Sequence, residues 1–168
     1  MSGNLSQIEN DCRQVRAVRQ MTAADVSAIA TMERQAFSDP WSEEALLAET
    51  CTNPKGRSYV ALVDERLAAY LIYWSFAGEG HIARIVVEKD HQRRGIGSAL
   101  LSQCLKRMRQ DQIGEVYLEV RSSNAAAIKL YTKSGFEKVG VRKNYYFRDR
   151  EDAILMRLTL KEGKNELV

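Results

Sequence analysis

Residues 92–97, Gln-Arg-Arg-Gly-Ile-Gly, have the composition of a loop that binds an anion. They lie between a segment with strand character and a segment with helical spacing, so they include the start of a helix. The first backbone amides of a helix lack intrahelical acceptors, and its dipole is positive at that end. Gly95 and Gly97 have no side chain that would hold a pyrophosphate away, while Lys89 and His91 add positive charge. A diphosphate fits this segment.

The hexapeptide differs from the two commonest phosphate-binding motifs, GxxxxGK[ST] and GxGxxG. It matches Q/R-x-x-G-x-G/A, the acetyl-CoA signature of the GNAT superfamily of N-acetyltransferases. The strand before it and the helix after it, which this signature requires, are both expected here. A glycine pair at a helix start also occurs where elements merely pack tightly, and the hexapeptide alone leaves that alternative open.

Residues 118–146 resemble the ribosomal-protein alanine N-acetyltransferases of the RimI type, a branch of the same superfamily. The segment FSDPWSEEAL at 37–46 resembles the helix-loop-helix that covers the acceptor in these enzymes, so the resemblance spans most of residues 15–158. In that family the strand carries a glutamate, the turn an asparagine and the next helix a tyrosine. The resemblance places these residues at Glu119, Asn124 and Tyr131 of this sequence. It also implies that acetyl-CoA is bound by Asn124 and by Ile85, Val86, Val87, Arg93, Arg94, Gly95, Ile96, Gly97 and Ser98.

Transfer of an acetyl group from a thioester to an amine needs a neutral amine, a polarised carbonyl and a proton for the departing thiolate. We assign Glu119 as the general base and expect partial burial to raise its pKa. We assign Tyr131 as the general acid, because a phenol with a reference pKa of about 10 can protonate a thiolate whose acid is near 8.5. The structural alternatives are an ion pair of Glu119 with Arg121 and a core aromatic at Tyr131.

The cysteines do not indicate a covalent mechanism. Cys12, Cys51 and Cys104 are an odd number at wide spacing, which fits neither a disulfide framework nor a CxxC pair. None of them follows a histidine-and-acid pattern, so we expect direct attack of the amine in a ternary complex. We expect no metal site, and we interpret His91 as a surface loop residue.

These candidate residues need a mixed α/β (α+β) framework. The predicted order is β-α-α-β-β-β-α-β-α-β-β, beginning with a strand at 15–19 and a helix from Thr22 to about Ala36, with Ser42 capping the second helix. A helix joins strand 81–87 to the strand VYLEV, so this crossover makes the two strands parallel. The resemblance implies the GNAT fold, a mostly antiparallel sheet of about seven strands with a central parallel pair and about four helices.

Length and composition indicate one folded domain. The 168 residues carry a formal net charge of +3 and are 45% hydrophobic, which is ordinary for a globular protein. We expect a domain at 15–160 between flexible segments at 1–14 and 161–168. No long apolar run or secretory signal is present and no basic face is clustered, so we expect a cytoplasmic protein that binds neither membrane nor nucleic acid directly.

The acceptor implied by the resemblance is the N-terminal alanine of a small-subunit ribosomal protein. An α-amine suits a single modest base, because deprotonating lysine at pH 7 costs about 3.7 kcal/mol more. The alternatives are a lysine or small-molecule amine acetyltransferase, a non-catalytic acetyl-CoA-binding module and, last, a basic RNA-binding module. A peptide groove is predicted from Trp41, Arg142, Lys143, Asn144, Tyr145, Tyr146 and Phe147, which alternatively pack the sheet edge.

Overall fold

A computed structural model of the chain describes residues 17–160. The elements are β1 (Ala17–Gln20), a 3-10 turn (Ala23–Asp25), α2 (Val26–Ala36), α3 (Glu43–Cys51), β2 (Gly56–Val63), β3 (Arg66–Phe76), β4 (Glu79–Val87), a 3-10 turn (Lys89–His91), α4 (Ile96–Gln110), β5 (Glu115–Arg121), α5 (Ala125–Lys133), β6 (Glu137–Tyr146) and β7 (Glu151–Thr159). This order confirms the predicted one. The predicted terminal segments and Val15 lie outside the described residues.

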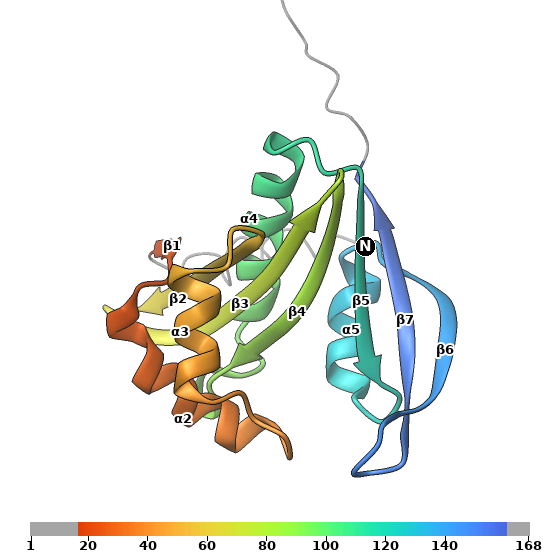
Figure 1. Cartoon of the computed structure of the whole chain (residues 1–168), viewed down its shortest axis with the longest axis horizontal. Helices are drawn as coiled ribbons and strands as arrows, with labels where there is room; N and C mark the ends of the chain where they lie inside the picture. Colours follow the sequence, from red (N-terminus) through yellow and green to blue (C-terminus); the bar gives the residue numbers. More distant parts are fainter. Residues whose placement is uncertain (1–16, 161–168) are drawn as a thin grey trace, which may run out of the picture.

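The seven strands form one sheet in the order β1-β2-β3-β4-β5-β7-β6. Neighbouring strands are antiparallel except β4 and β5, which are parallel. The crossover through α4 explains this exception, because a strand that returns through a helix enters the sheet in the same direction. The predicted mixed sheet with a central parallel pair and four α-helices is therefore confirmed (Figure 1).

Local capping signals fix several element boundaries. The Asp25 carboxylate accepts a hydrogen bond from the Thr22 amide at 2.8 Å, although the first turn is a 3-10 turn rather than the α-helix that we predicted from Thr22. The Ser42 side chain accepts from the Ala45 amide and starts α3, as expected. Gly135, with φ +94°, follows the end of α5 in the left-handed conformation that glycine tolerates.

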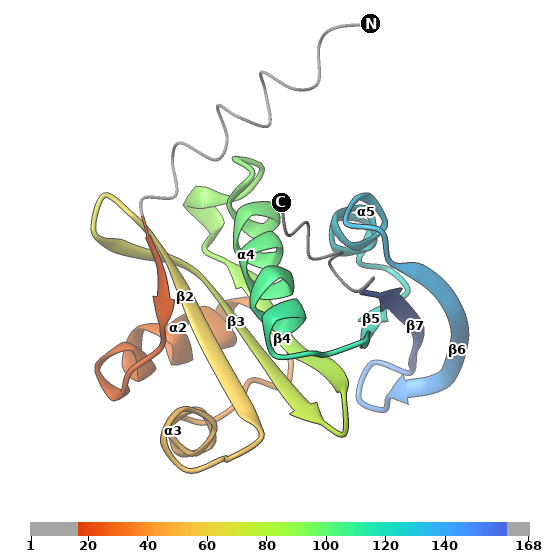
Figure 2. The same ribbon diagram turned by 90° about the horizontal axis from the view of Figure 1, so that it is seen from above.

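The helices cover the two faces of the sheet in pairs. Figure 2 shows α2 and α3 on one face and α4 and α5 on the other. The α4 face holds the larger core, in which Leu100, Leu101 and Met108 are fully buried. The α2 face holds a second core around Ile29, Leu46 and other buried side chains. Each face of the sheet therefore buries its own apolar layer, which fixes the orientation of every central strand. Within residues 17–160, no helix is long and apolar enough to cross a membrane.

The central parallel pair opens part way along its length. β4 and β5 are in register only from Glu79 opposite Glu115 to Ile82 opposite Leu118, and the strands then separate (Figure 1). The pairing of β4 with β3 shifts at the same point, because Ile72 lies opposite Arg84 while Tyr73 lies opposite Ile82. Ala83 is thus an extra residue, a β-bulge that bends the strand and increases its twist. The bulge and the separation together leave a gap in the middle of the sheet.

Candidate active site

A cavity of about 270 Å³ occupies the gap between β4 and β5. Glu119 reaches this cavity from β5. Tyr131 reaches it from α5, which lies on the face of the sheet opposite α2 and α3. The structure therefore brings the two predicted catalytic residues to one cavity. The other side chains that line it are Phe37, Asp39, Ile82, Ala83, Arg84, Ile85, Val120, Arg121, Asn124, Ala127, Tyr145 and Tyr146.

The Glu119 carboxylate is bound by an imidazole rather than by Arg121. Its Oε2 lies 2.8 Å from Nε2 of His81, and its Oε1 lies 3.4 Å from the Arg142 guanidinium. The hydrogen bond to His81 lowers the pKa of Glu119 below its ordinary value, although burial acts in the opposite direction. Our expectation of a raised pKa was therefore wrong. Within the described chain Arg121 pairs instead with Asp149 and Glu151.

Sequence reasoning did not place His81 in the candidate site. Its ring stacks on Trp74, with ring centroids 5.9 Å apart, and Trp74 stacks on Trp41. The Trp74 indole donates a hydrogen bond to Glu49 at 2.9 Å. These contacts hold the imidazole plane against the Glu119 carboxylate. The sequence signal for the pair of His81 and Glu119 is a histidine near the start of a strand that has a parallel neighbour. This signal does not give the register between the two strands, so it does not show that the two side chains meet.

Tyr131 is buried, with 5% of its surface exposed, and packs edge-on against Phe136 at 5.7 Å between ring centroids. Burial raises the pKa of its phenol above the ordinary value of 10, so the hydroxyl stays protonated at neutral pH. The phenol thus combines core packing, which was the structural alternative, with a place at the cavity wall.

The predicted anion site is the start of α4, where Gly95 is the N-cap residue with φ +73°. A second cavity of about 550 Å³ lies over this helix end. Its lining includes the predicted residues Ile85, Val86, Val87, Arg93, Gly95, Ile96, Gly97, Ser98 and Asn124. Arg94 is the one predicted cofactor residue that is absent from this lining. The two cavities share Phe37, Ile85, Asn124 and Ala127 in their linings, so they are adjacent near the gap.

Two glycines make this helix end possible for different reasons. Gly95 occupies a left-handed conformation that costs other residues strain. A Cβ on Gly97 would lie 3.2 Å from Cγ2 of Val87, so Gly97 lets α4 pack closely against β4. The tight-packing alternative therefore holds for Gly97. The Gln92 side chain donates to the Val87 carbonyl at 3.1 Å, which ties the loop to the end of β4. His91, interpreted above as a surface loop residue, is partly buried, and its Nδ1 lies 2.6 Å from Oε2 of Glu88.

The edge of β4 that faces the gap has backbone groups available to a ligand. β4 pairs with β3 along Ile85, Val86 and Val87, but its pairing with β5 ends at Ile82. Within residues 17–160, the peptide groups beyond Ile82 on that edge therefore have no strand to bond. An extended chain with amide groups can bind such an edge as an added strand. Asn124 caps α5 by accepting from the Ala127 amide at 3.1 Å and lies between the two cavities.

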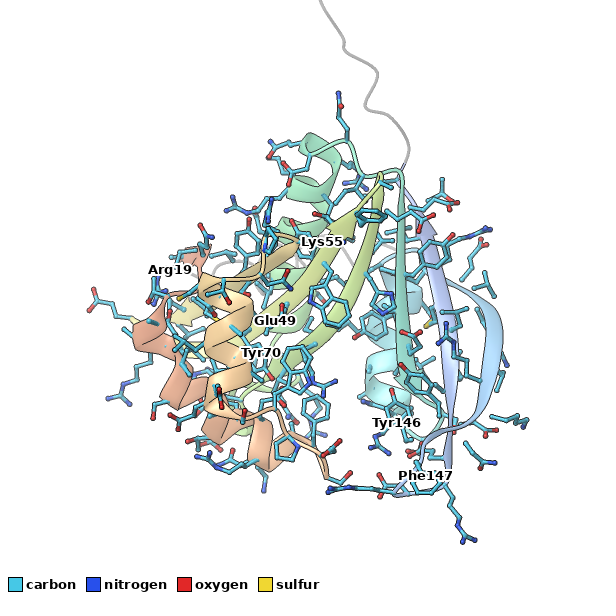
Figure 3. The ribbon with its side chains drawn as sticks, viewed as in Figure 1. Arg19, Glu49, Lys55, Tyr70, Tyr146 and Phe147 are labelled. Atoms are coloured by element: carbon cyan, nitrogen blue, oxygen red, sulfur yellow. The ribbon has the colours of Figure 1, made fainter. Side chains whose placement is uncertain are left out.

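The predicted rim residues divide into two groups. Tyr145 and Tyr146 line the gap cavity, and Arg142 approaches Glu119. Phe147 is 87% exposed at the outer end of the β6–β7 connection (Figure 3), and Lys143 and Asn144 bind Asp152 on β7. Trp41, in the α2–α3 connection, stacks on Trp74 of β3. Only part of the predicted groove therefore faces the cavity.

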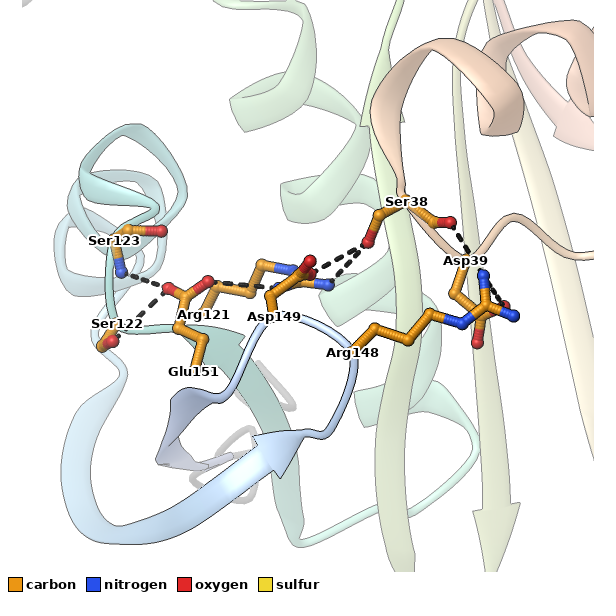
Figure 4. Close-up of polar contacts among 8 residues, drawn as sticks. All are labelled: Ser38, Asp39, Arg121, Ser122, Ser123, Arg148, Asp149 and Glu151. Carbon is orange, nitrogen blue, oxygen red and sulfur yellow. Dashed lines mark hydrogen bonds and ion pairs between the residues drawn. The ribbon is translucent and has the colours of Figure 1, made fainter.

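Polar contacts close one end of the gap cavity by joining the α2–α3 and β6–β7 connections (Figure 4). The Ser38 hydroxyl donates to Asp149 at 3.0 Å, and Arg148 lies 3.7 Å from Asp39. Arg121 on β5 bonds to Asp149 at 2.6 Å and to Ser38 at 3.3 Å. Arg121 is therefore the centre of this cluster, which fixes the two connections relative to the sheet.

Within residues 17–160, no three histidine, cysteine, aspartate or glutamate side chains are grouped so that they could hold a metal ion.

Known proteins have sequences similar to this one. A model of the Acetyltransferase (GNAT) family matches residues 26–136. The [ribosomal protein bS18]-alanine N-acetyltransferase of Salmonella typhimurium is 35% identical over 83% of this chain and 95% of that protein. An N-alpha-acetyltransferase of Sulfurisphaera tokodaii is 36% identical over 83% of this chain and 90% of that protein.

Solved structures agree with the sequence comparisons. The crystal structure of the ribosomal-protein-S18-alanine N-acetyltransferase from Escherichia coli is 31% identical, covers 90% of this chain and 98% of its own, and superposes with a TM-score of 0.80. The family match covers the open parallel pair, the glycine-lined start of α4 and the Glu119 strand together. This chain therefore belongs to the GNAT family of acetyltransferases.

Proposed function

We propose that this enzyme transfers the acetyl group of acetyl-CoA to the N-terminal amine of a protein, with an N-terminal alanine of a small-subunit ribosomal protein as its acceptor. The observation that carries the proposal is the adjacency of two cavities that share four lining residues, one at the start of α4 and one beside Glu119 and His81. Relatives named as alanine and N-alpha-acetyltransferases support the choice of acceptor.

The residues around the larger cavity fit acetyl-CoA. The free amides at the start of α4 suit a diphosphate, with Arg93 beside them in the cavity lining. The unpaired edge of β4 suits the amide groups of a pantetheine arm. A ligand bound in this way directs its sulfur end toward Asn124 and the gap. Acetyl-CoA supplies an activated acyl group there, and every proton movement falls to side chains of this chain.

Proton transfer is assigned to Glu119, His81 and Tyr131. The acceptor must lose a proton before or during attack on the thioester carbonyl, and the Glu119–His81 pair takes it. A carboxylate with a lowered pKa is a weak base by itself. The larger contribution of Glu119 is to orient the His81 imidazole and to stabilise, by its negative charge, a proton that the pair takes up. The C–S bond breaks as the C–N bond forms, and the protonated Tyr131 donates its proton to the sulfur.

A peptide panel read by mass tests this function. Purified protein with acetyl-CoA is given an Ala-initiated peptide, an N-blocked peptide that contains lysine, and spermidine. We expect a gain of one acetyl group on the Ala-initiated peptide, with much slower reaction on the other two amines. Preferential reaction of the lysine peptide or spermidine contradicts the proposed acceptor. Binding of acetyl-CoA without turnover of any amine contradicts the enzymatic proposal.

A further inference from the structure

Arg84 lines the gap cavity because of the bulge in β4. In a regular strand, residues 81 and 84 would face opposite sides of the sheet. The extra residue Ala83 reverses the alternation, so that His81 and Arg84 both face the side covered by α2 and α3. Glu119, which contacts His81, faces the same side. The bulge therefore brings the Arg84 guanidinium to the cavity that contains the Glu119–His81 pair.

The Arg84 side chain is held rigidly. Its guanidinium lies over the Phe37 ring at 4.5 Å and over the Trp41 ring at 4.7 Å. Its Nε lies 3.4 Å from Oε1 of Glu33, which is fully buried on α2. Glu33 is itself fixed by hydrogen bonds from the Tyr70 hydroxyl and from the Trp41 amide at 2.8 Å. The buried carboxylate balances the arginine charge, and the rings fix its plane.

The guanidinium nevertheless has hydrogen-bonding capacity left over. An arginine carries five N–H donors in a planar fork. Among the described residues, Nε has no hydrogen bond of normal geometry, and the only one made by Arg84 is a long 3.4 Å contact from an outer nitrogen to the Ala83 carbonyl. A donor group that lines a cavity with most of its bonds unmade favours a ligand with an acceptor oxygen.

We propose that Arg84 binds the first carbonyl oxygen of the acceptor chain and so selects an α-amine over a lysine side chain. The ligand is a neutral carbonyl rather than a carboxylate, because Glu33 already compensates the guanidinium charge. In an N-terminal residue, the carbonyl is attached to the carbon that carries the amine. In a lysine, five carbon atoms separate the amine from the carbonyl. An amine at Glu119 therefore brings a carbonyl into the same cavity only if it is terminal.

This inference rests on the proposed function, and its test separates the two. Steady-state kcat/KM is measured for an Ala-initiated peptide and for the same peptide with its first carbonyl oxygen replaced by sulfur, a weaker acceptor. Arg84→Met should lower kcat/KM for the oxygen peptide about 10-fold to 100-fold, the range for a hydrogen bond to a charged group. It should also abolish the preference for oxygen over sulfur, while the affinity for acetyl-CoA is unchanged.

Two further variants guard the result. Arg84→Met leaves Glu33 buried without its cation, so the double variant Glu33→Gln/Arg84→Met removes both charges and should show the same loss of preference in a folded protein. Arg66→Met, at the exposed first residue of β3, is the matched control and should keep the wild-type ratio. A full oxygen-to-sulfur preference in folded Arg84 variants overturns this inference alone. Failure of the wild type to acetylate the Ala-initiated peptide overturns the proposed function and the inference with it.

Discussion

Nε2 of His81 lies 2.8 Å from Oε2 of Glu119, across the point where β4 and β5 separate. The two residues come from parallel strands joined by the whole of α4, and each faces the side of the sheet covered by α2 and α3. The pairing lowers the pKa of the carboxylate and holds the imidazole in one orientation. A carboxylate and an imidazole joined in this way act as one unit toward an amine.

Glu119→Gln should reduce kcat/KM for the peptide about 10²-fold to 10⁴-fold, the usual contribution of general acid–base groups. The amide keeps the size of the side chain but cannot orient an imidazole that must accept a proton. Calorimetry should give an unchanged affinity for acetyl-CoA. Glu115→Gln, on the same strand but bound to Tyr117 outside the cavity, is the control and should keep wild-type turnover. Unaltered turnover in Glu119→Gln would remove this residue from its assigned role.

His81→Leu should make the reaction more sensitive to acid. The hydrogen bond from His81 is the largest cause of the lowered pKa of Glu119, and burial opposes it, so removing the imidazole raises the pKa of the carboxyl. Glu119 then protonates at a higher pH than in the wild type. The ratio of variant to wild-type kcat/KM should therefore fall as the pH decreases toward the ordinary pKa of a glutamate, about 4.3. Thermal melts at each pH check that both proteins stay folded, and a constant ratio would contradict the expectation.

Gly95→Glu should abolish uptake of acetyl-CoA, as measured by calorimetry. The substitution places a carboxylate at the positive end of α4, where the diphosphate is proposed to bind, and strains a residue with φ +73°. Gly78→Glu is a matched control, because Gly78 also has a positive φ, of +82°, with open space around it and no proposed ligand. If both variants bind acetyl-CoA equally well, the start of α4 is not the diphosphate site.

Arg121→Met should lower the free energy of unfolding by about 0.5–2 kcal/mol, since it removes two partly exposed ion pairs. It should also raise KM for the peptide, because the β6–β7 connection then loses the contact of Asp149 with β5. Arg148→Met removes two exposed contacts, one of 3.7 Å to Asp39 and one of 3.4 Å to the Ser38 carbonyl, and should change the free energy of unfolding by less than about 0.5 kcal/mol. Denaturant melts and peptide kinetics measure both effects. Equal changes in the two variants would show that Arg121 is not the centre of the cluster.

The parts of the site that the sequence predicted are encoded locally. A strand followed by two glycines and a helical run places an anion site at Gly95 without reference to the rest of the chain. The cap at Asn124 is local in the same sense, because the side chain and the amide that it binds are three residues apart. The crossover rule then orients β4 and β5 in parallel, which brings Glu119 to the centre of the sheet.

The missed parts depend on register. A bulge at Ala83 reverses which residues of β4 face α2, and the sequence HIARIVV contains no proline or glycine that marks it. The contact of His81 with Glu119 needs this register together with the parallel pairing. Arg84 and Glu33 meet only after α2 packs on the sheet. The expected rise in the pKa of Glu119 failed for this reason, because burial was foreseen and the neighbouring imidazole was not.

Tyr131→Phe should lower kcat about 10²-fold, near the lower end for general acid–base groups, because a thiolate is a good leaving group even without a donor. Burial keeps the phenol of the wild type protonated, so kcat should show no loss from pH 7 to about 9. Tyr73→Phe is the control, because its buried hydroxyl has no hydrogen-bond partner in the described chain and its loss should change neither turnover nor stability measurably. An acetyl thioester analogue of acetyl-CoA whose thiol is more acidic should recover part of the loss in Tyr131→Phe. Its departing thiolate is a weaker base than that of CoA and therefore depends less on protonation. Equal losses with both thioesters would place Tyr131 in the structure of the cavity rather than in proton transfer.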